Sequence, residues 1–184
     1  NRGCFRRRFR ENREFFFFFY HWKTCTRKFA FRHFISATKF GIRRDCSTIS
    51  DSTFRSSGIF FTFRFIVDDC IKFVKREQRR GRKYDGIVMD PPSYGRGPNG
   101  ELWKLEEELF PLIQECMKIL SDDALFFIVN CYTTGFSCST LNEALSRSIQ
   151  KEKGGHIECS ENLLPVTTND SVLPCGIFGR WTND

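Results

Sequence analysis

The first 64 residues contain no Leu, Val, Met, Gln or Pro, although Leu is among the commonest residues of folded domains. The same segment holds 15 of the 22 Phe, five of them consecutive at residues 15–19. Because an ordinary core is not built in this way, we expect residues 1–64 to be poorly packed. Residues 65–184 have an ordinary composition and all six prolines, and we expect them to carry the folded unit.

Charge changes at the same boundary. Residues 1–64 carry 15 Lys and Arg against 4 Asp and Glu, a net charge of +11, whereas residues 65–184 carry 14 against 18, a net charge of −4. Two hypotheses explain the N-terminal segment. It is either an out-of-frame translation or a basic tail whose interleaved Arg and Phe contact the phosphates and bases of nucleic acid. The joint loss of Leu and Val favours the out-of-frame hypothesis.

Other absences exclude whole classes of protein. No apolar run approaches the ~20 residues of a membrane-spanning helix, and the run at residues 15–20 is too short for the core of a secretory signal. The nine cysteines are odd in number and include no Cys-x-x-Cys pair, so we expect reduced thiols in a cytoplasmic protein. His156 has no partner at ligand spacing, and we expect no metal. The chain starts with Asn1 rather than Met, which is typical of a fragment.

From residue 65 onward, apolar runs alternate with amphipathic segments. The predicted elements are strands at residues 65–67, 84–89, 124–129, 156–159 and 172–177, and helices at residues 70–80, 102–120 and 137–150. This alternation predicts an α/β fold built on an open, mostly parallel sheet. Ligands bind beyond the carboxyl ends of the strands in such sheets, which is where Asp69, Asp90 and Cys131 fall.

The most informative local motif is Asp90-Pro91-Pro92-Ser93-Tyr94, directly after an apolar strand. The two prolines end the strand and stiffen the turn, because proline cannot donate to a strand ladder. The Asp90 carboxylate and the Pro91 carbonyl can then converge on a donor such as an exocyclic amine, with the Tyr94 ring stacked on a planar base. The alternative is a turn that only ends the strand and leaves Asp90 solvated. The preceding strand and the glycine-rich stretch that follows favour a binding site.

Residues 65–184 resemble class I S-adenosylmethionine-dependent methyltransferases, from IVDDCIKF through the DPPSY motif to LFFIVNCYTTG. They look closest to the bacterial ribosomal-RNA large-subunit methyltransferase-like group. The resemblance implies a Rossmann-like, seven-stranded sheet with helices on both faces, of which residues 65–184 supply the C-terminal half. It also implies an enzyme that uses S-adenosylmethionine to methylate ribosomal RNA.

The same resemblance implies roles for individual residues. Asp69 matches the acidic position that accepts a hydrogen bond from the adenine amine of the cofactor, with the backbone of Cys70 beside it. Asp69 also suits a helix N-cap, and the two roles are compatible. The methyl-transfer site is matched by four residues of the motif, namely Asp90, Pro91, Pro92 and Tyr94.

The chemistry of the methylated atom depends on Asp90 and Cys131. An amine target needs hydrogen-bond acceptors, which Asp90 and the Pro91 carbonyl supply, whereas a carbon target such as cytosine C5 needs a thiolate nucleophile. Cys131 lies at a suitable strand end. However, free cysteines are commonly buried as small apolar residues, and we favour that interpretation. The methylated atom, the RNA position and the oligomeric state stay open.

One part of the family pattern is missing. The family binds its cofactor with a glycine-rich loop after the first strand, yet residues 1–64 contain only three separated glycines, at positions 3, 41 and 58. Two functions therefore stay open: a methyltransferase, active or inactivated by this loss, and a non-catalytic half-domain that binds RNA through the basic N-terminal segment. A second basic cluster surrounds the turn at residue 81 and consists of Arg76, Arg79, Arg80, Arg82 and Lys83. These side chains could contact RNA phosphates, but we favour the interpretation that they are the solvated end of a helix.

Overall fold

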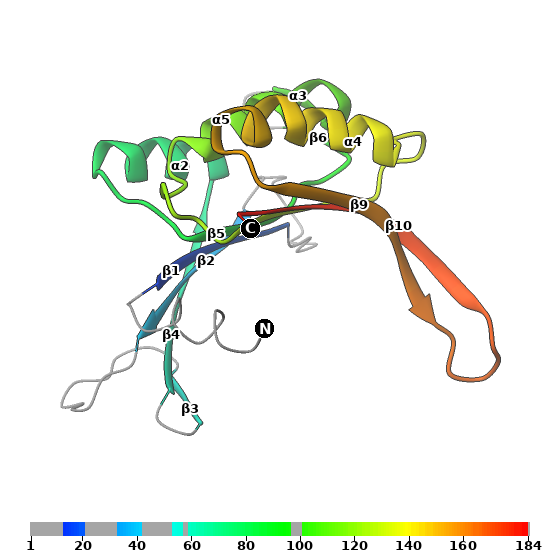
Figure 1. The fold of residues 1–184 in the computed structure, drawn as a ribbon, viewed down its shortest axis with the longest axis horizontal. Coiled ribbons are helices and arrows are strands. Elements are labelled where there is room, and N and C mark those ends of the chain that lie inside the picture. Colours follow the sequence, from blue (N-terminus) through cyan, green and yellow to red (C-terminus); the bar gives the residue numbers. More distant parts are fainter. Residues whose placement is uncertain (1–12, 21–32, 42–52, 57–58, 97–100, 184) are drawn as a thin grey trace.

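The computed structural model describes residues 13–20, 33–41, 53–56, 59–96 and 101–183 (Figure 1). Eight strands form one sheet in the order β3-β4-β2-β1-β5-β8-β10-β9. Their bounds are β1 (Arg13–Tyr20), β2 (His33–Gly41), β3 (Thr53–Ser56), β4 (Ile59–Asp68), β5 (Gly86–Asp90), β8 (Phe126–Cys131), β9 (His156–Pro165) and β10 (Val172–Thr182). A small separate hairpin consists of β6 (Tyr94–Arg96) and β7 (Leu102–Lys104). The helices are α2 (Cys70–Arg79), α3 (Leu105–Met117), α4 (Cys138–Leu145), the π-helical η1 (Ser146–Gln150) and α5 (Lys151–Lys153).

Five strands of the sheet, β4, β1, β5, β8 and β9, run in the same direction. β5 pairs in parallel with β1 and with β8, and β2 runs antiparallel between β1 and β4. The α/β class is confirmed, but the sheet is mixed rather than mostly parallel. One reason lies at its edge, where β9 and β10 are joined by a short turn at residues 166–171. Such a turn permits only antiparallel pairing, since a parallel pair needs a long crossover.

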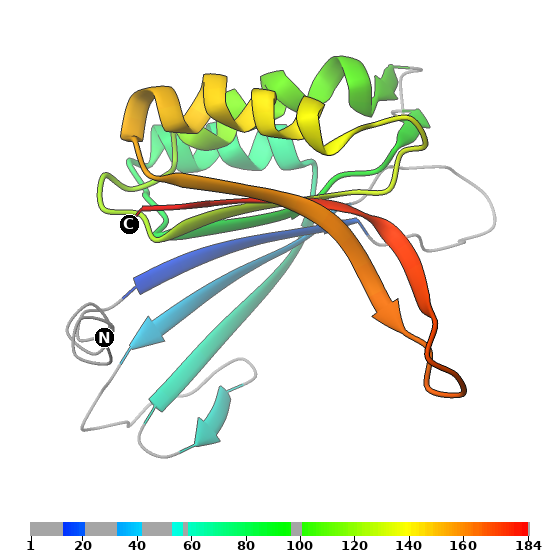
Figure 2. The ribbon, with the colours of Figure 1, turned by 45° about the vertical axis from the view of Figure 1, so that its right-hand side comes forward.

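The described helices lie together over one face of the sheet (Figures 1 and 2). Of the two helix layers that the resemblance implies for the complete sheet, the described residues supply one. α2 presents Cys70, Phe73, Val74 and Glu77 on its buried side, because residues three or four apart share one face of a helix. The sheet side of this core includes Ile87, Met89, Phe127 and Val129, which are fully buried.

Phe16, from the Phe-rich run, is fully buried in this core. Its ring stacks on that of Phe73 with a centroid separation of 5.3 Å, and it lies 5.4 Å from the ring of Tyr84. At Phe16 the expectation of poor packing is therefore wrong, because β1 occupies a central position beside β5 and faces α2. The division of the chain at residue 64 stays a prediction, although β4 (Ile59–Asp68) runs across that boundary.

Candidate functional site

The carboxyl ends of β4, β1, β5 and β8 meet at one edge of the sheet, since these strands share a direction. Asp69 follows β4, Asp90 ends β5 and Cys131 ends β8, so the structure places all three at this edge, here called the carboxyl edge. The strand register puts Val67 and Asp90 in one row, with β2 and β1 between them. Three strand spacings separate the two by about 14 Å, which leaves room for a ligand lying along the edge.

Asp90 carries a buried oxygen that has no hydrogen-bond partner. Its Oδ1 accepts no hydrogen bond from any residue that the structure describes. Burial raises the pKa of the Asp90 carboxyl above its ordinary value, and hydrogen bonding by the Tyr132 hydroxyl opposes that rise. An unpaired buried acceptor destabilises a fold, so Asp90 is suited to accept a hydrogen bond from a ligand.

The loop after Asp90 is anchored by contacts that the sequence did not reveal. The Trp103 indole Nε1 donates to the Pro92 carbonyl at 2.7 Å, and the Leu105 amide donates to the Ser93 carbonyl at 3.1 Å. Pro91 is buried beneath this turn. The Tyr94 ring, by contrast, is 54% exposed, as a surface for stacking requires. Trp103, from the β6–β7 hairpin, is thus a supporting residue of the motif.

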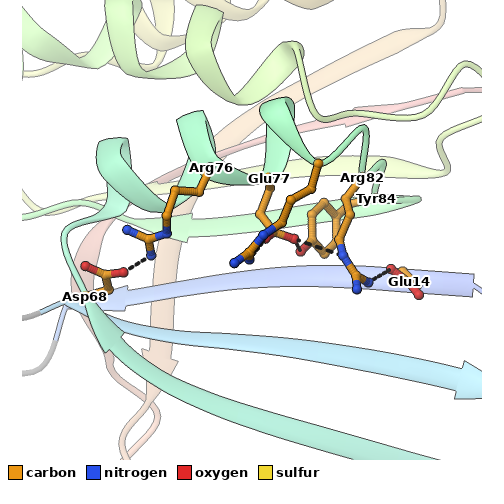
Figure 3. Close-up of polar contacts among 7 residues, drawn as sticks. Glu14, Asp68, Arg76, Glu77, Arg82 and Tyr84 are labelled. Carbon is orange, nitrogen blue, oxygen red and sulfur yellow. Dashed lines mark hydrogen bonds and ion pairs between the residues drawn. The ribbon is translucent and has the colours of Figure 1, made fainter.

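Asp69 has the structural role that its sequence position suggested. It is the N-cap of α2, and its Oδ1 accepts from the Lys72 amide at 2.9 Å. Asp68 accepts from the Asp69 amide at 2.8 Å and pairs with Arg76 (Figure 3). The Cys70 side chain points into the core, where burial and then the neighbouring Cys116 raise its pKa. Only the backbone of Cys70 is therefore available to a ligand at this edge.

The surroundings of Cys131 disfavour a thiolate. Cys131 is buried, and burial followed by the nearby Asp90 carboxylate raises the pKa of its thiol to about 12. This agrees with the interpretation of Cys131 as a small buried apolar residue. The next residue, Tyr132, was missed by the sequence reasoning, although its place directly beyond the same strand was a usable signal. Its ring is 52% exposed at the carboxyl edge.

Most of the second basic cluster is engaged within the protein. Arg79 alone of its members forms no ion pair or hydrogen bond with the described residues. Arg76 pairs with Asp68, and Arg82 pairs with Glu14 at 3.8 Å (Figure 3). The other observed contacts are Arg80 with Glu77 at 2.7 Å, Arg82 with Glu77 at 3.7 Å, and Lys83 with the Lys118 carbonyl at 2.9 Å. The cluster therefore fits a structural role better than a phosphate-binding one.

β1 stands where a loop after its carboxyl end would face Asp90, because Phe19 is in register with Asp90. The stretch that follows, residues 21–32, contains no glycine and lies outside the described residues. Most of the basic N-terminal segment, residues 1–64, also lies outside the described residues. The alternative function, RNA binding by this segment, therefore stays a prediction. In the described ranges there is no group of three or more His, Cys, Asp or Glu that could hold a metal ion, and no helix long and apolar enough to cross a membrane.

The structure is similar to the crystal structure of the SAM-dependent methyltransferase from Agrobacterium tumefaciens. The two chains are 34% identical with a TM-score of 0.57, over 63% of this chain and 38% of that one. The chain shares the fold of that methyltransferase. It spans little more than a third of the other chain's length. A weaker likeness links it to SMU.776, a structure complexed with SAH, at 21% identity and a TM-score of 0.46, over 63% of this chain and 30% of that one. No family model matches the chain.

Proposed function

We propose that this chain is part of an S-adenosylmethionine-dependent methyltransferase that methylates an amine of ribosomal RNA in the cytoplasm. The observation that carries the proposal is the buried, unpartnered oxygen of Asp90 at the carboxyl end of a central strand. The likeness in fold and the 34% identity to the Agrobacterium enzyme support the reaction class. The six described cysteines are free, in keeping with a reducing compartment.

The residues at the carboxyl edge suit the adenine of such a cofactor at one end and the substrate amine at the other. When bound, S-adenosylmethionine supplies an activated methyl group, so the protein needs little acid–base machinery. Asp69 keeps acceptor capacity beyond its helix-cap bond and would hold the adenine amine, with the Cys70 backbone beside it. At the other end, Asp90 would accept an N–H of the substrate amine.

The surroundings of Asp90 favour this role. Its raised pKa makes the carboxylate a better proton acceptor, while the Pro91-Pro92 turn, held by Trp103, keeps it in place. Methylation of a carbon atom is disfavoured, because it needs a thiolate nucleophile and the Cys131 thiol, with a pKa of about 12, is a poor source of thiolate. The exposed rings of Tyr94 and Tyr132 suit stacking on unpaired RNA bases.

Transfer of a radiolabelled methyl group tests the proposal. The chain is incubated with tritium-methyl S-adenosylmethionine and unmodified large-subunit ribosomal RNA made in vitro, and RNA-bound label is counted. We expect label with the wild type and at least a hundredfold less with Asp90→Ala. Asp122→Ala is the matched control, because Asp122 is fully exposed at the opposite edge of the sheet. Absence of label from the RNA with wild-type protein would contradict the proposal.

A further inference from the structure

We infer that Tyr132 is a substrate-binding residue, whose ring forms a fixed platform on which an unpaired base of the RNA stacks. The inference deepens the proposed function and rests on it, since it names a residue that holds the RNA next to the amine acceptor. Tyr132 directly follows β8, and β8 pairs in parallel with β5, the strand that ends at Asp90. The ring therefore belongs to the carboxyl edge.

The backbone of β10 packs directly against the Tyr132 ring. β10 pairs with β8 only as far as Ile177 opposite Cys131, so its residues before Ile177 run past the end of β8, where Tyr132 lies. Gly176 has φ +96°, and a Cβ there would lie 2.9 Å from Tyr132 Cδ1 and 2.4 Å from the Cys131 carbonyl oxygen. Only glycine combines this backbone conformation with so close an approach. Gly176 thus provides the space in which the ring lies.

Hydrogen bonds hold the hydroxyl end of the same ring. The hydroxyl oxygen of Tyr132 accepts from the Asn130 side-chain amide at 3.3 Å, and Asn130 Oδ1 accepts in turn from the Asn162 side-chain amide at 3.0 Å. With Asn130 in β8, Asn162 in β9 and Gly176 in β10, three strands hold the ring in place. An aromatic side chain that is already ordered loses little conformational entropy when a ligand stacks on it.

The ring keeps an exposed surface in spite of these contacts, since Tyr132 is 52% exposed. A held, half-exposed ring suits stacking on a base that is not paired within the RNA. The next residue supplies a second observation, because Thr133 Oγ1 is buried and, like Asp90 Oδ1, has no hydrogen-bond partner among the described residues. Unfilled polar atoms on both of these strand ends favour a planar ligand that also carries hydrogen-bonding groups, as a base does.

The place of Tyr132 in the sheet favours RNA over the cofactor as the source of this base. Asp69, to which the adenine of the cofactor is assigned, follows β4, whereas Tyr132 follows β8, and β2, β1 and β5 lie between these two strands. Four strand spacings amount to about 19 Å. An adenine held at Asp69 therefore leaves the Tyr132 ring to the substrate.

Equilibrium binding of a fluorescein-labelled, single-stranded oligoribonucleotide to the full chain, followed by fluorescence anisotropy, tests the inference. Tyr132→Leu keeps an apolar side chain but removes the aromatic face, and we expect it to weaken RNA binding roughly fivefold or more. The conservative variant Tyr132→Phe keeps the ring and should restore RNA binding to within about twofold of the wild type. Leu173→Ala is the matched control; it removes a side chain 56% exposed on β10 and should leave RNA binding unchanged.

Calorimetric titration with S-adenosylhomocysteine separates the two sources of a stacked base. We expect the same affinity for S-adenosylhomocysteine in the wild type and in Tyr132→Leu. A weaker affinity in Tyr132→Leu would assign the ring to the cofactor adenine and overturn the inference. Equal RNA binding by Tyr132→Leu and the wild type, equal weakening in Tyr132→Leu and Tyr132→Phe, or a wild-type chain that does not bind the oligoribonucleotide would overturn it as well.

These outcomes are distinct from failure of the proposed function, which is absence of methyl transfer by the wild type. A chain that binds RNA through Tyr132 but transfers no methyl group would contradict the proposed function and leave the RNA contact standing. In a chain that transfers the methyl group, Tyr132→Leu should raise the KM for RNA roughly fivefold or more and leave kcat within about twofold, as expected of a residue that binds substrate without taking part in the chemical step.

Discussion

The two ends of β5 hold carboxylates in opposite situations. At the amino end, Asp85 accepts from the Ser121 hydroxyl at 3.0 Å and from the Glu14 amide at 2.8 Å. Glu77, only 3% exposed, accepts there from the Tyr84 hydroxyl at 2.8 Å (Figure 3). At the carboxyl end, Asp90 Oδ1 has no partner among the described residues. The carboxylates at the amino end are thus satisfied within the protein, whereas Asp90 keeps an acceptor oxygen without a partner, as the proposed function requires.

A second atom supports this distinction. Among the described side chains, two buried polar atoms lack a hydrogen-bond partner, and these are Asp90 Oδ1 and Thr133 Oγ1. Asp90 ends β5 and Thr133 follows β8 by two residues, so both belong to the carboxyl edge. Unpaired buried groups are uncommon in native folds, and their concentration at one edge is typical of a functional site.

The largest effect on stability is expected from Phe16→Ala, which disrupts the packing at the amino end of β5. Phe16 is fully buried against Phe73 and Tyr84, so its removal should lower the free energy of unfolding by about 3–4 kcal/mol. Urea denaturation measures the change. Leu164→Ala, at a side chain 56% exposed on the β9–β10 hairpin, is the control and should cost less than about 0.5 kcal/mol. Equal effects of the two substitutions would show that β1 is not integral to the core.

Tyr84→Phe should give a smaller loss, about 2 kcal/mol. The substitution keeps the ring against Phe16 but removes the hydroxyl that donates to the buried Glu77 carboxylate. Burial, and then the hydrogen bond to Glu77, raise the pKa of Tyr84, so the hydroxyl stays protonated and the loss should not vary between pH 6 and 9. Thermal unfolding at several pH values measures it. A loss below about 0.5 kcal/mol would contradict the account of this end.

Asp90→Asn should act in the opposite direction and raise the free energy of unfolding at pH 7 by about 1 kcal/mol. Because the folded pKa of Asp90 is raised, the folded state binds the proton more tightly, and wild-type stability falls as pH rises through the interval between the unfolded and folded pKa values. The gain of the variant should appear above that interval and vanish below it. Asp122→Asn, at an exposed carboxylate, should show no such gain. A lower free energy of unfolding for Asp90→Asn than for the wild type at neutral pH would contradict the contrast between the carboxylates at the two ends of β5.

Much of the region after residue 65 could be predicted because its signals are local. α2 begins after its N-cap Asp69, and β5 ends where Pro91 and Pro92 cannot continue a ladder. Asp69, Asp90 and Cys131 were correctly assigned to one edge, because parallel strands place their carboxyl ends together.

The remainder depends on contacts between residues distant in the sequence. The burial of Phe16 follows from the place of β1 between β2 and β5, which composition does not reveal. The hydrogen bond between Asn162 and Asn130 requires the registers of both β8 with β10 and β10 with β9.

Calorimetric titration with S-adenosylhomocysteine, the product form of the cofactor, tests the central claim most directly. We predict micromolar binding by the wild type and none by Asp69→Ala. Ser137→Ala controls for the lost helix cap, since Ser137 caps α4 by accepting from the Thr140 amide at 3.1 Å; it should bind as the wild type does. Absence of binding to the folded wild-type chain, or equal binding by Asp69→Ala, would contradict the claim that the carboxyl edge is a cofactor site.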